Sequence, residues 1–297
     1  MHRRMSPSCQ HSKGFSLVEL AIALVIIALV LVLFIGASSG FISSKRNEVT
    51  TVKLKAIETA IALFVAQNKR LPCPADGTIP AGTALSGVEE RGGGGDCDNN
   101  QVNGVVPALT LGMSEADVLD GWNNRITYRV YSGVPGSLTR NDGVDMSWCD
   151  PVGIPPAVPV APNNTCDPTC TSANLGSCVR PSQFLAGKGL QIQNAAGTIL
   201  MDPAGGGQGA AYVLISHGDN QEGAFTQNGA LLGATGAQSG IKELLNRNGF
   251  ALRLPPANFY VDSDYNGSDT VNHFDDLVLR PSIISVASKA QLGPRAH

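Results

Sequence analysis

Oxygen-bearing side chains that alternate along a short C-terminal segment are the residues best suited to binding a metal ion. They stand at positions 1, 3, 5 and 7 of that segment: Asp262, Asp264, Asn266 and Ser268. Gly267 at position 6 permits the sharp turn of a calcium loop, but His273 stands where position 12 normally supplies a bidentate Glu. Asp275 or Asp276 would have to reach in instead. The spacing leaves two interpretations, a solvated turn, which we favour, and a calcium site. Residues 96–100 show the same oxygen pattern without the Gly and are a weaker candidate.

Residues 216–219, Ser-His-Gly-Asp, contain the three residue types of a hydrolytic triad. The members of a triad come from distant segments, and adjacent residues do not usually form one. The sequence has no Gly-x-Ser-x-Gly elbow, phosphate-binding loop or His-Glu-x-x-His motif. It therefore predicts that these residues are a strand end entering a turn and that the protein is not an enzyme.

Six of the seven cysteines lie in loops rich in Pro, Gly and Asn, and only Cys9 lies near the N-terminus. The six are Cys73, Cys97, Cys149, Cys166, Cys170 and Cys178. An even set of this kind indicates disulfides in an oxidising compartment. We favour a Cys73–Cys97 pair, because these residues flank one Gly-rich loop. Zinc bound by the last three cysteines is the alternative, although that cluster lacks a second Cys pair or a nearby His.

The longest apolar stretch, residues 15–37, has 23 residues and one ionisable side chain, Glu19. About 20 apolar residues are enough for a helix to cross a bilayer. Arg3, Arg4 and Lys13 precede the stretch, and no comparable basic group follows before residues 45–46. This asymmetry predicts a cytoplasmic N-terminus and a translocated remainder.

Two ordinary membrane signals explain this stretch less well. A secretory signal peptide cleaved near Ala37 would have an apolar run of 7–15 residues, which is shorter than this one. A plain signal anchor accounts for the length. It does not account for Glu19, since a charge within the bilayer is costly without a partner.

Residues 13–20, KGFSLVEL, resemble the processing site of type IV prepilins and type II secretion pseudopilins. The resemblance implies that an aspartyl prepilin peptidase cuts after Gly14 and N-methylates Phe15, so that residues 1–14 are a leader peptide. It also implies that the partners are other pilin or pseudopilin subunits and an inner-membrane assembly platform. Many pilins have Pro where this chain has Gly36, and Gly also weakens a helix, by about 1 kcal/mol.

The resemblance also provides a partner for Glu19. Cleavage would create a free amine at Phe15, about one helical turn before Glu19. In the family, the Glu of one subunit is thought to pair with the terminal amine of its neighbour in the filament. Because a buried carboxylate needs such a partner, this pairing would fix the register of assembly.

Residues 38–70 have the pattern of an amphipathic continuation of the helix. Their apolar side chains recur at helical spacing: Leu54, Ile57, Ile61, Phe64 and Val65. Pro72 marks the end of the segment. A single helix from residue 15 to about residue 70 would be roughly 84 Å long. Two helices that break at residues 36–40 are the alternative.

Residues 71–297 are predicted to form a periplasmic head with short strands. The candidate strands are residues 125–131, 211–216, 250–254 and 276–279. Short strands between turns indicate an antiparallel sheet laid on the helix, which is an α+β fold of pilin type with a membrane-spanning first half of the helix. Residues 150–182, rich in Pro and Cys, are read as a surface loop tied by disulfides.

Residues 120–128 are similar to the Asp-x-Trp-Gly-Asn-x-x-Tyr region of major pseudopilins and several minor pilins. Asn123 stands at the usual Gly position, and Asn is one of the few residues that accept left-handed backbone angles. We predict a turn that leads into the first strand, with Trp122 packed on the helix.

The charge balance gives no sign of bulk attraction to nucleic acid or anionic lipid. The chain has 21 Lys and Arg against 24 Asp and Glu, a net charge of −3, and removing three basic leader residues gives −3 − 3 = −6. The predicted function is that of a minor pilin or pseudopilin, anchored in the inner membrane with a periplasmic head before it joins a filament. The alternative is a tip adhesin or DNA-uptake pilin that binds a ligand through residues 150–182.

Overall fold

The computed structural model describes most of the chain and divides it into two compact units, Met1–Lys45 and Arg46–His297. The described residues are 16–92, 96–98, 101–133, 136–152, 166–233, 240–255, 259–267 and 271–295; residues 31–40 are described by their backbone alone. The second unit contains the whole sheet structure, and we refer to it as the head.

Helix α1, Leu17–Asn68, passes through residues 36–40 without a break. Its sequence contains no Pro and is rich in Ala, Leu and other residues that tolerate a helix. The helix stops where Lys69 adopts a left-handed conformation with φ 56°, while its N–H still donates to the carbonyl of Val65 at 2.7 Å. Pro72 follows three residues later and prevents continuation.

Within the head, one side of α1 is buried in the main hydrophobic core. Leu54, Ile57, Ile61 and Val65 are at most 4% exposed, as their spacing predicts. Phe64 belongs to the same sequence pattern but is only partly buried, and the Arg70 guanidinium lies over its ring at 4.9 Å. The buried stripe is therefore narrower than the apolar pattern.

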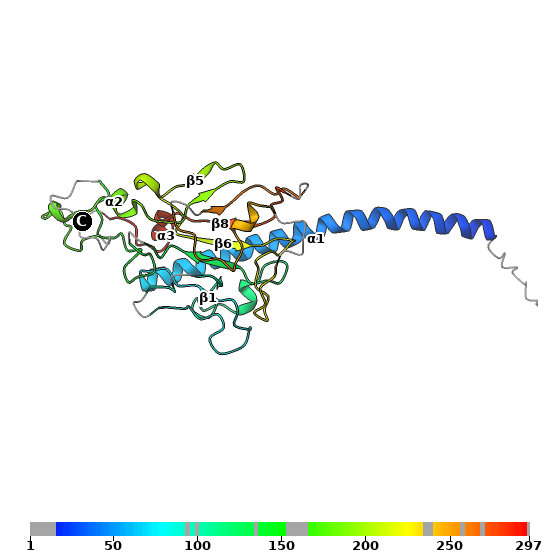
Figure 1. Ribbon diagram of the computed structural model, residues 1–297, viewed down its shortest axis with the longest axis horizontal. Coiled ribbons are helices and arrows are strands. Elements are labelled where there is room, and N and C mark those ends of the chain that lie inside the picture. Colours follow the sequence, from blue (N-terminus) through cyan, green and yellow to red (C-terminus); the bar gives the residue numbers. More distant parts are fainter. Residues whose placement is uncertain are drawn as a thin grey trace, which may run out of the picture. The chain divides into compact units, whose positions relative to one another are not determined.

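The main sheet of the head has five antiparallel strands in the order β1-β2-β3-β6-β8. Figure 1 labels β1, β6 and β8 of this sheet. The strands are β1 Ala75–Asp76, β2 Gly104–Val105, β3 Thr127–Val130, β6 Tyr212–Ser216 and β8 Leu277–Leu279. Three of them fall inside predicted strands. A long helix followed by an antiparallel sheet head confirms the predicted α+β class.

The central strand β3 is buried on both faces, although its sequence alternates between apolar and polar residues. Tyr128 and Val130 join the core cluster that includes α1. On the opposite face, Thr127 is fully buried and Arg129 is 2% exposed. The Arg129 guanidinium donates to the carbonyl of Val102 at 2.7 Å, so long connections bury this second face through polar contacts.

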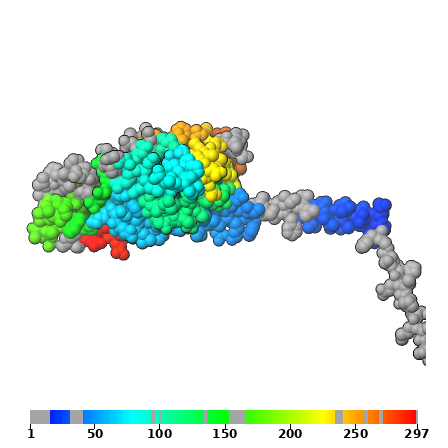
Figure 2. Space-filling view, turned by 90° about the horizontal axis from the view of Figure 1, so that it is seen from below, coloured from blue at the N-terminus to red at the C-terminus, as the bar shows by residue number. Residues whose placement is uncertain are grey.

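A smaller sheet and short helices complete the head. The smaller sheet has the order β5-β4-β7, with β4 Ile192–Gln193, β5 Ile199–Met201 and β7 Tyr260–Val261. The α-helices are α2 Pro181–Leu185 and α3 Ile283–Lys289, and the 3-10 helices are η1 Glu115–Val118, η2 Leu175–Ser177, η3 Ala204–Gly206 and η4 Glu243–Leu245. Seen from below, much of the head surface is formed by the segments that follow α1, coloured cyan to green (Figure 2).

The strand predicted at residues 250–254 is wrong, because this segment forms no ladder. The N–H of Arg253 is directed instead to the hydroxyl of Tyr260, at 3.4 Å. The neighbouring strand β7 pairs in parallel with β4. Apolar residues near Pro255 therefore pack as an irregular segment, with side chains satisfying part of the backbone.

The turn before β3 has the conformation predicted for Asn123, whose φ is 70°. The side chain of Asp120 organises this turn, because its Oδ1 accepts the N–H groups of Trp122 and Asn124, each at 2.9 Å. Asp120 is 4% exposed, so the turn is fixed by a buried carboxylate.

Gly121 brings this turn against the backbone of α1. A Cβ at Gly121 would lie 2.4 Å from the carbonyl oxygen of Arg46, so any side chain would force the turn away. The Gly121 N–H donates to Thr50 Oγ1 at 2.8 Å. Trp122 is only partly buried, and its indole N–H donates to Asp219 Oδ1 at 2.5 Å.

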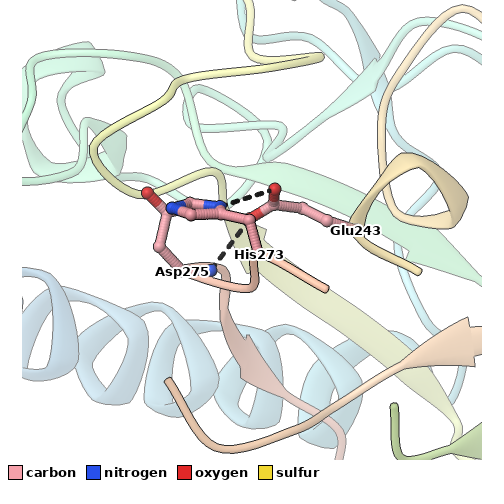
Figure 3. A group of neighbouring side chains, drawn as sticks. All are labelled: Glu243, His273 and Asp275. Atoms are coloured by element: carbon pink, nitrogen blue, oxygen red, sulfur yellow. Dashed lines mark hydrogen bonds and ion pairs between the residues drawn. The ribbon is translucent and has the colours of Figure 1, made fainter. Parts of the chain in front are cut away.

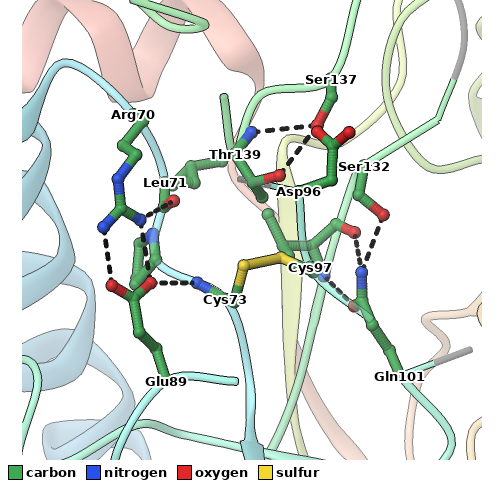
Figure 4. The surroundings of a disulfide bond; sticks show 12 residues. Arg70, Leu71, Cys73, Glu89, Asp96, Cys97, Gln101, Ser132, Ser137 and Thr139 are labelled. Atoms are coloured by element: carbon green, nitrogen blue, oxygen red, sulfur yellow. Dashed lines mark hydrogen bonds and ion pairs between the residues drawn. A yellow bond between two sulfur atoms is a disulfide. The ribbon is translucent and has the colours of Figure 1, made fainter. Parts of the chain in front are cut away.

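Six buried cysteines lie in three disulfide pairs. The pairs are Cys73–Cys97, Cys149–Cys166 and Cys170–Cys178, with Cα–Cα distances of 5.2, 5.0 and 4.5 Å. Figure 4 shows the first of them directly after α1. Because Cys166 pairs outside the proposed zinc cluster, the three cysteines of that cluster are not gathered as ligands. Most of the loop at 150–182 is described, but residues 153–165 lie outside the described residues.

We expect all six cysteines to be oxidised in the purified protein. Alkylation without prior reduction should label none of them, and mass spectrometry of the peptides checks this. The Cys73→Ala/Cys97→Ala double variant should lose about 3 kcal/mol of unfolding free energy, because an open loop of this length gains chain entropy on unfolding. Labelling of Cys73 together with Cys97 in the untreated protein would contradict the pair.

Candidate functional site

The N-terminal end of α1 contains the one predicted assembly residue that the structure describes, Glu19. Its Oε2 accepts the N–H of Ser16 at 2.9 Å. A carboxylate in the first turn also interacts favourably with the helix dipole. Gly14 and Phe15, the predicted processing residues, lie outside the described residues.

Apolar side chains cover the first part of α1 on all sides. The large ones between Leu17 and Val30 are 45% to 85% exposed. The predicted membrane-spanning segment extends to residue 37, and the side chains of residues 31–40 lie outside the described set. Among the described residues, no helix has the length and apolar character needed to span a membrane.

Two of the predicted calcium ligands have other contacts in the structure. The carboxylate of Asp262 is paired with Arg280, whose Nε donates to Oδ2 at 2.5 Å. Asp264 is exposed, and the backbone of Asn266 pairs with that of Phe274 in an isolated bridge. Ser268 lies outside the described residues. Calcium at this loop stays a prediction.

A buried polar cluster lies beside this loop, around Glu243 in η4 (Figure 3). His273 Nδ1 lies 3.1 Å from Glu243 Oε2, and the N–H of Asp275 donates to Oε1 at 2.8 Å. Asn220 Nδ2 donates to Oε2 at 2.6 Å. The Glu243 side chain is only 1% exposed, so this carboxylate is held by several donors inside the protein.

The carboxyl group of Asp275 is held close to Glu243. Its Oδ2 accepts the N–H groups of Asp219 and Asn220 at 2.8 and 3.0 Å. Burial first, and then the neighbouring Glu243 carboxylate, raise the pKa of Asp275 to about 7. Two acidic groups side by side in a buried site are unusual, because each disfavours the charged form of the other.

The next residue, Asp276, belongs to a separate buried network. Burial raises its pKa, and His217 acts in the opposite direction from 3.6 Å. Asn246 Nδ2 donates to Asp276 Oδ2 at 2.7 Å. On its other ring nitrogen, His217 contacts Thr127 Oγ1 at 2.8 Å. This network joins the polar face of β3 to β8.

One family model matches the chain, the prokaryotic N-terminal methylation motif, at residues 9–35. The chain carries a prepilin-type N-terminus. The match contains Gly14, Phe15 and Glu19, and the motif is characteristic of type IV prepilins and pseudopilins. No curated protein and no solved structure matches the chain.

A prepilin-type N-terminus is a structural motif and not that of an enzyme family. The geometry at residues 216–219 agrees with this reading, because the three triad residue types have separate partners. Ser216 Oγ donates to Asp120 Oδ2 at 2.7 Å, whereas His217 contacts Thr127. Asp219 accepts the indole N–H of Trp122. The three side chains are therefore not hydrogen-bonded to one another in the chain that a triad requires.

A buried lysine in the head is also no catalytic candidate. Burial lowers the pKa of Lys188 to about 7, a value often associated with a reactive amine. However, Lys188 is 1% exposed and its Nζ lies 3.6 Å from the centre of the Phe184 ring. A substrate could not reach it without opening the core.

Proposed function

We propose that this protein is a structural subunit, a minor pilin or pseudopilin, of a type IV pilus or a type II secretion pseudopilus. Prepilin peptidase cuts it after Gly14, and the inner-membrane platform then assembles the mature chain through α1. Before assembly the chain is anchored in the inner membrane with the head in the periplasm. The observation that carries this proposal is the methylation motif at residues 9–35.

Two features of the structure support assembly through α1. The apolar side chains between Leu17 and Val30 are exposed within the chain, so they need lipid or neighbouring helices to cover them. Glu19 stands among them as a carboxylate whose described contact, with Ser16, is local. An amine from a neighbouring subunit would neutralise that charge once the helices pack together.

The size of the head favours a low-abundance or tip position. Residues 46–297 form one compact unit with two sheets and long connections. A bulky head of this kind would crowd a filament in which every subunit carries it. Three disulfide pairs suit an extracytoplasmic location, where disulfides persist.

The processing step is tested at the N-terminus of the protein extracted from membranes. We expect mass spectrometry to find a mature chain that begins at an N-methylated Phe15. Gly14→Ala should still be processed, whereas Gly14→Val should accumulate with its leader, because a bulky side chain does not fit the peptidase cleft. A chain that keeps Met1, or one that begins at Ser38, contradicts the proposed function.

A further inference from the structure

Glu243, His273 and Asp275 place three potential metal-ligand atoms close together inside the head. One atom from each residue, a nitrogen and two carboxylate oxygens, lies within 4.8 Å of the other two. In the part of the chain that the structure describes, no other group of three or more His, Cys, Asp or Glu side chains does so. Figure 3 shows the imidazole between the two carboxyl groups in that view. The spacing leaves room for one ion that touches all three residues.

The hydrogen bonds around Asp275 leave one of its carboxylate oxygens without a partner. Asp275 is 7% exposed, and the N–H groups of Asp219 and Asn220 bind its Oδ2. Its Oδ1 is buried and has no hydrogen-bond partner among the described residues. A buried acceptor that has lost water without gaining a donor is costly, and a cation would supply the missing interaction.

We propose that Glu243, His273 and Asp275 bind one divalent transition-metal ion, of which Zn²⁺ fits the ligand set best. Zinc accepts imidazole nitrogen and carboxylate oxygen, and three protein ligands leave a fourth position for water or a second carboxylate oxygen. Calcium takes six to eight oxygen ligands, which a buried set with a nitrogen donor does not offer. The positive charge also offsets the repulsion between the two neighbouring carboxylates.

The residues around the three ligands hold them in position. Asn220 Nδ2 donates to Glu243 Oε2 at 2.6 Å, and the backbone of Asp275 donates to Oε1. Gly218, with φ 53°, lies directly against Asp275, since a Cβ there would be 2.5 Å from Cγ and Oδ1. Such outer contacts orient metal ligands. A bound ion would cross-link η4, the turn at residues 217–220 and the segment before β8, and would limit their motion relative to one another.

Zinc titration of the full-length chain in detergent, after removal of metals by chelator, tests this site. Bound zinc is measured by equilibrium dialysis and metal analysis, and stability by the Tm. We expect zinc to raise the Tm of the wild type and chelator to reverse the change. Asp275→Asn preserves the shape of the side chain, and His273→Gln preserves a polar group. Both should weaken zinc binding at least about tenfold, and Asn220→Ala should weaken it about 10- to 100-fold.

The matched control is Asp262→Asn/Asp264→Asn, which removes two carboxylates from the neighbouring loop and should leave zinc binding unchanged. Cys9 and His11 are present in every variant, so any zinc that they bind contributes the same amount to the total measured for each variant. Failure of the wild type to bind zinc overturns the proposal, as does equal binding by the wild type, Asp275→Asn and His273→Gln. If His273→Gln lowers the Tm equally with zinc and with chelator, the residue only pairs with Glu243 and the proposal is also wrong.

Discussion

Glu89→Ala is expected to lower the free energy of unfolding of the head by about 3–5 kcal/mol, the usual cost of leaving a buried charge without its partner. The Arg70 guanidinium binds Glu89 through two hydrogen bonds, of 2.6 and 2.8 Å, with side chains 8% and 14% exposed (Figure 4). Glu89 Oε2 also accepts the N–H of Cys73 at 2.9 Å. The substitution therefore removes the carboxylate that binds both the Arg70 guanidinium and the Cys73 N–H, beside the Cys73–Cys97 pair. Chemical denaturation of the full chain, followed by tryptophan fluorescence, measures the loss.

Asp96 and Arg140 provide a matched control near the same disulfide. Arg140 Nη2 lies 2.6 Å from Asp96 Oδ2, but the Arg140 side chain is 66% exposed. Arg140→Ala should therefore cost far less than Glu89→Ala, because water screens and replaces an exposed pair. Equal losses in the two variants would show that burial does not decide the strength of these pairs.

The Glu89–Arg70 pair should also contribute to acid sensitivity. Burial alone would raise the pKa of Glu89, but the hydrogen bonds from Arg70 and the Cys73 N–H outweigh it and lower the pKa below the ordinary 4.5. A carboxyl group whose pKa is lower in the folded than in the unfolded protein stabilises the fold at any pH above its unfolded pKa. This stabilisation disappears as the pH falls through the folded pKa. The difference in stability between wild type and Glu89→Ala should therefore shrink below about pH 4.

The helix and the central strands could be predicted because their signals are local. Leu54, Ile57 and Ile61 repeat at the helical period over a segment with no Pro, and the buried face of α1 follows from that repeat. The left-handed conformation of Asn123 could be predicted because few residues tolerate it. Cys73 and Cys97 flank one loop, so their pairing needs no knowledge of distant contacts.

The polar interior could not be predicted because it depends on contacts between distant segments. Arg129 alternates with apolar residues along β3, and it is nevertheless buried, with Asn248 accepting a hydrogen bond from its guanidinium at 2.8 Å. Glu243 lies 30 residues before His273, and no local motif connects them. Asp262 resembled a calcium ligand in the sequence, whereas the structure pairs it with Arg280. The spacing of oxygens along a loop does not tell whether its carboxylates bind a metal ion or pair with the guanidinium of an Arg.

Glu19→Val is expected to abolish incorporation into filaments while leaving the chain in the membrane. The substitution removes a charge from an apolar segment, so insertion becomes easier. It also removes the proposed partner of the Phe15 amine. Breaking a buried charge pair costs about 3–5 kcal/mol. This cost corresponds to a fall in assembly of at least about 100-fold. Immunoblots of sheared filaments and of the membrane fraction measure the two effects separately.

Glu19→Gln separates the intersubunit charge pair from the local contact within α1. The Gln side chain can still accept the N–H of Ser16 that Glu19 Oε2 accepts at 2.9 Å, so the first turn of the helix keeps its hydrogen bond. It cannot neutralise an amine. If the charge pair fixes the register of assembly, Glu19→Gln should fail as Glu19→Val does. Filaments with wild-type amounts of Glu19→Gln would show that the carboxylate serves only the helix end, because the hydrogen bond to Ser16 is the one interaction that this variant preserves.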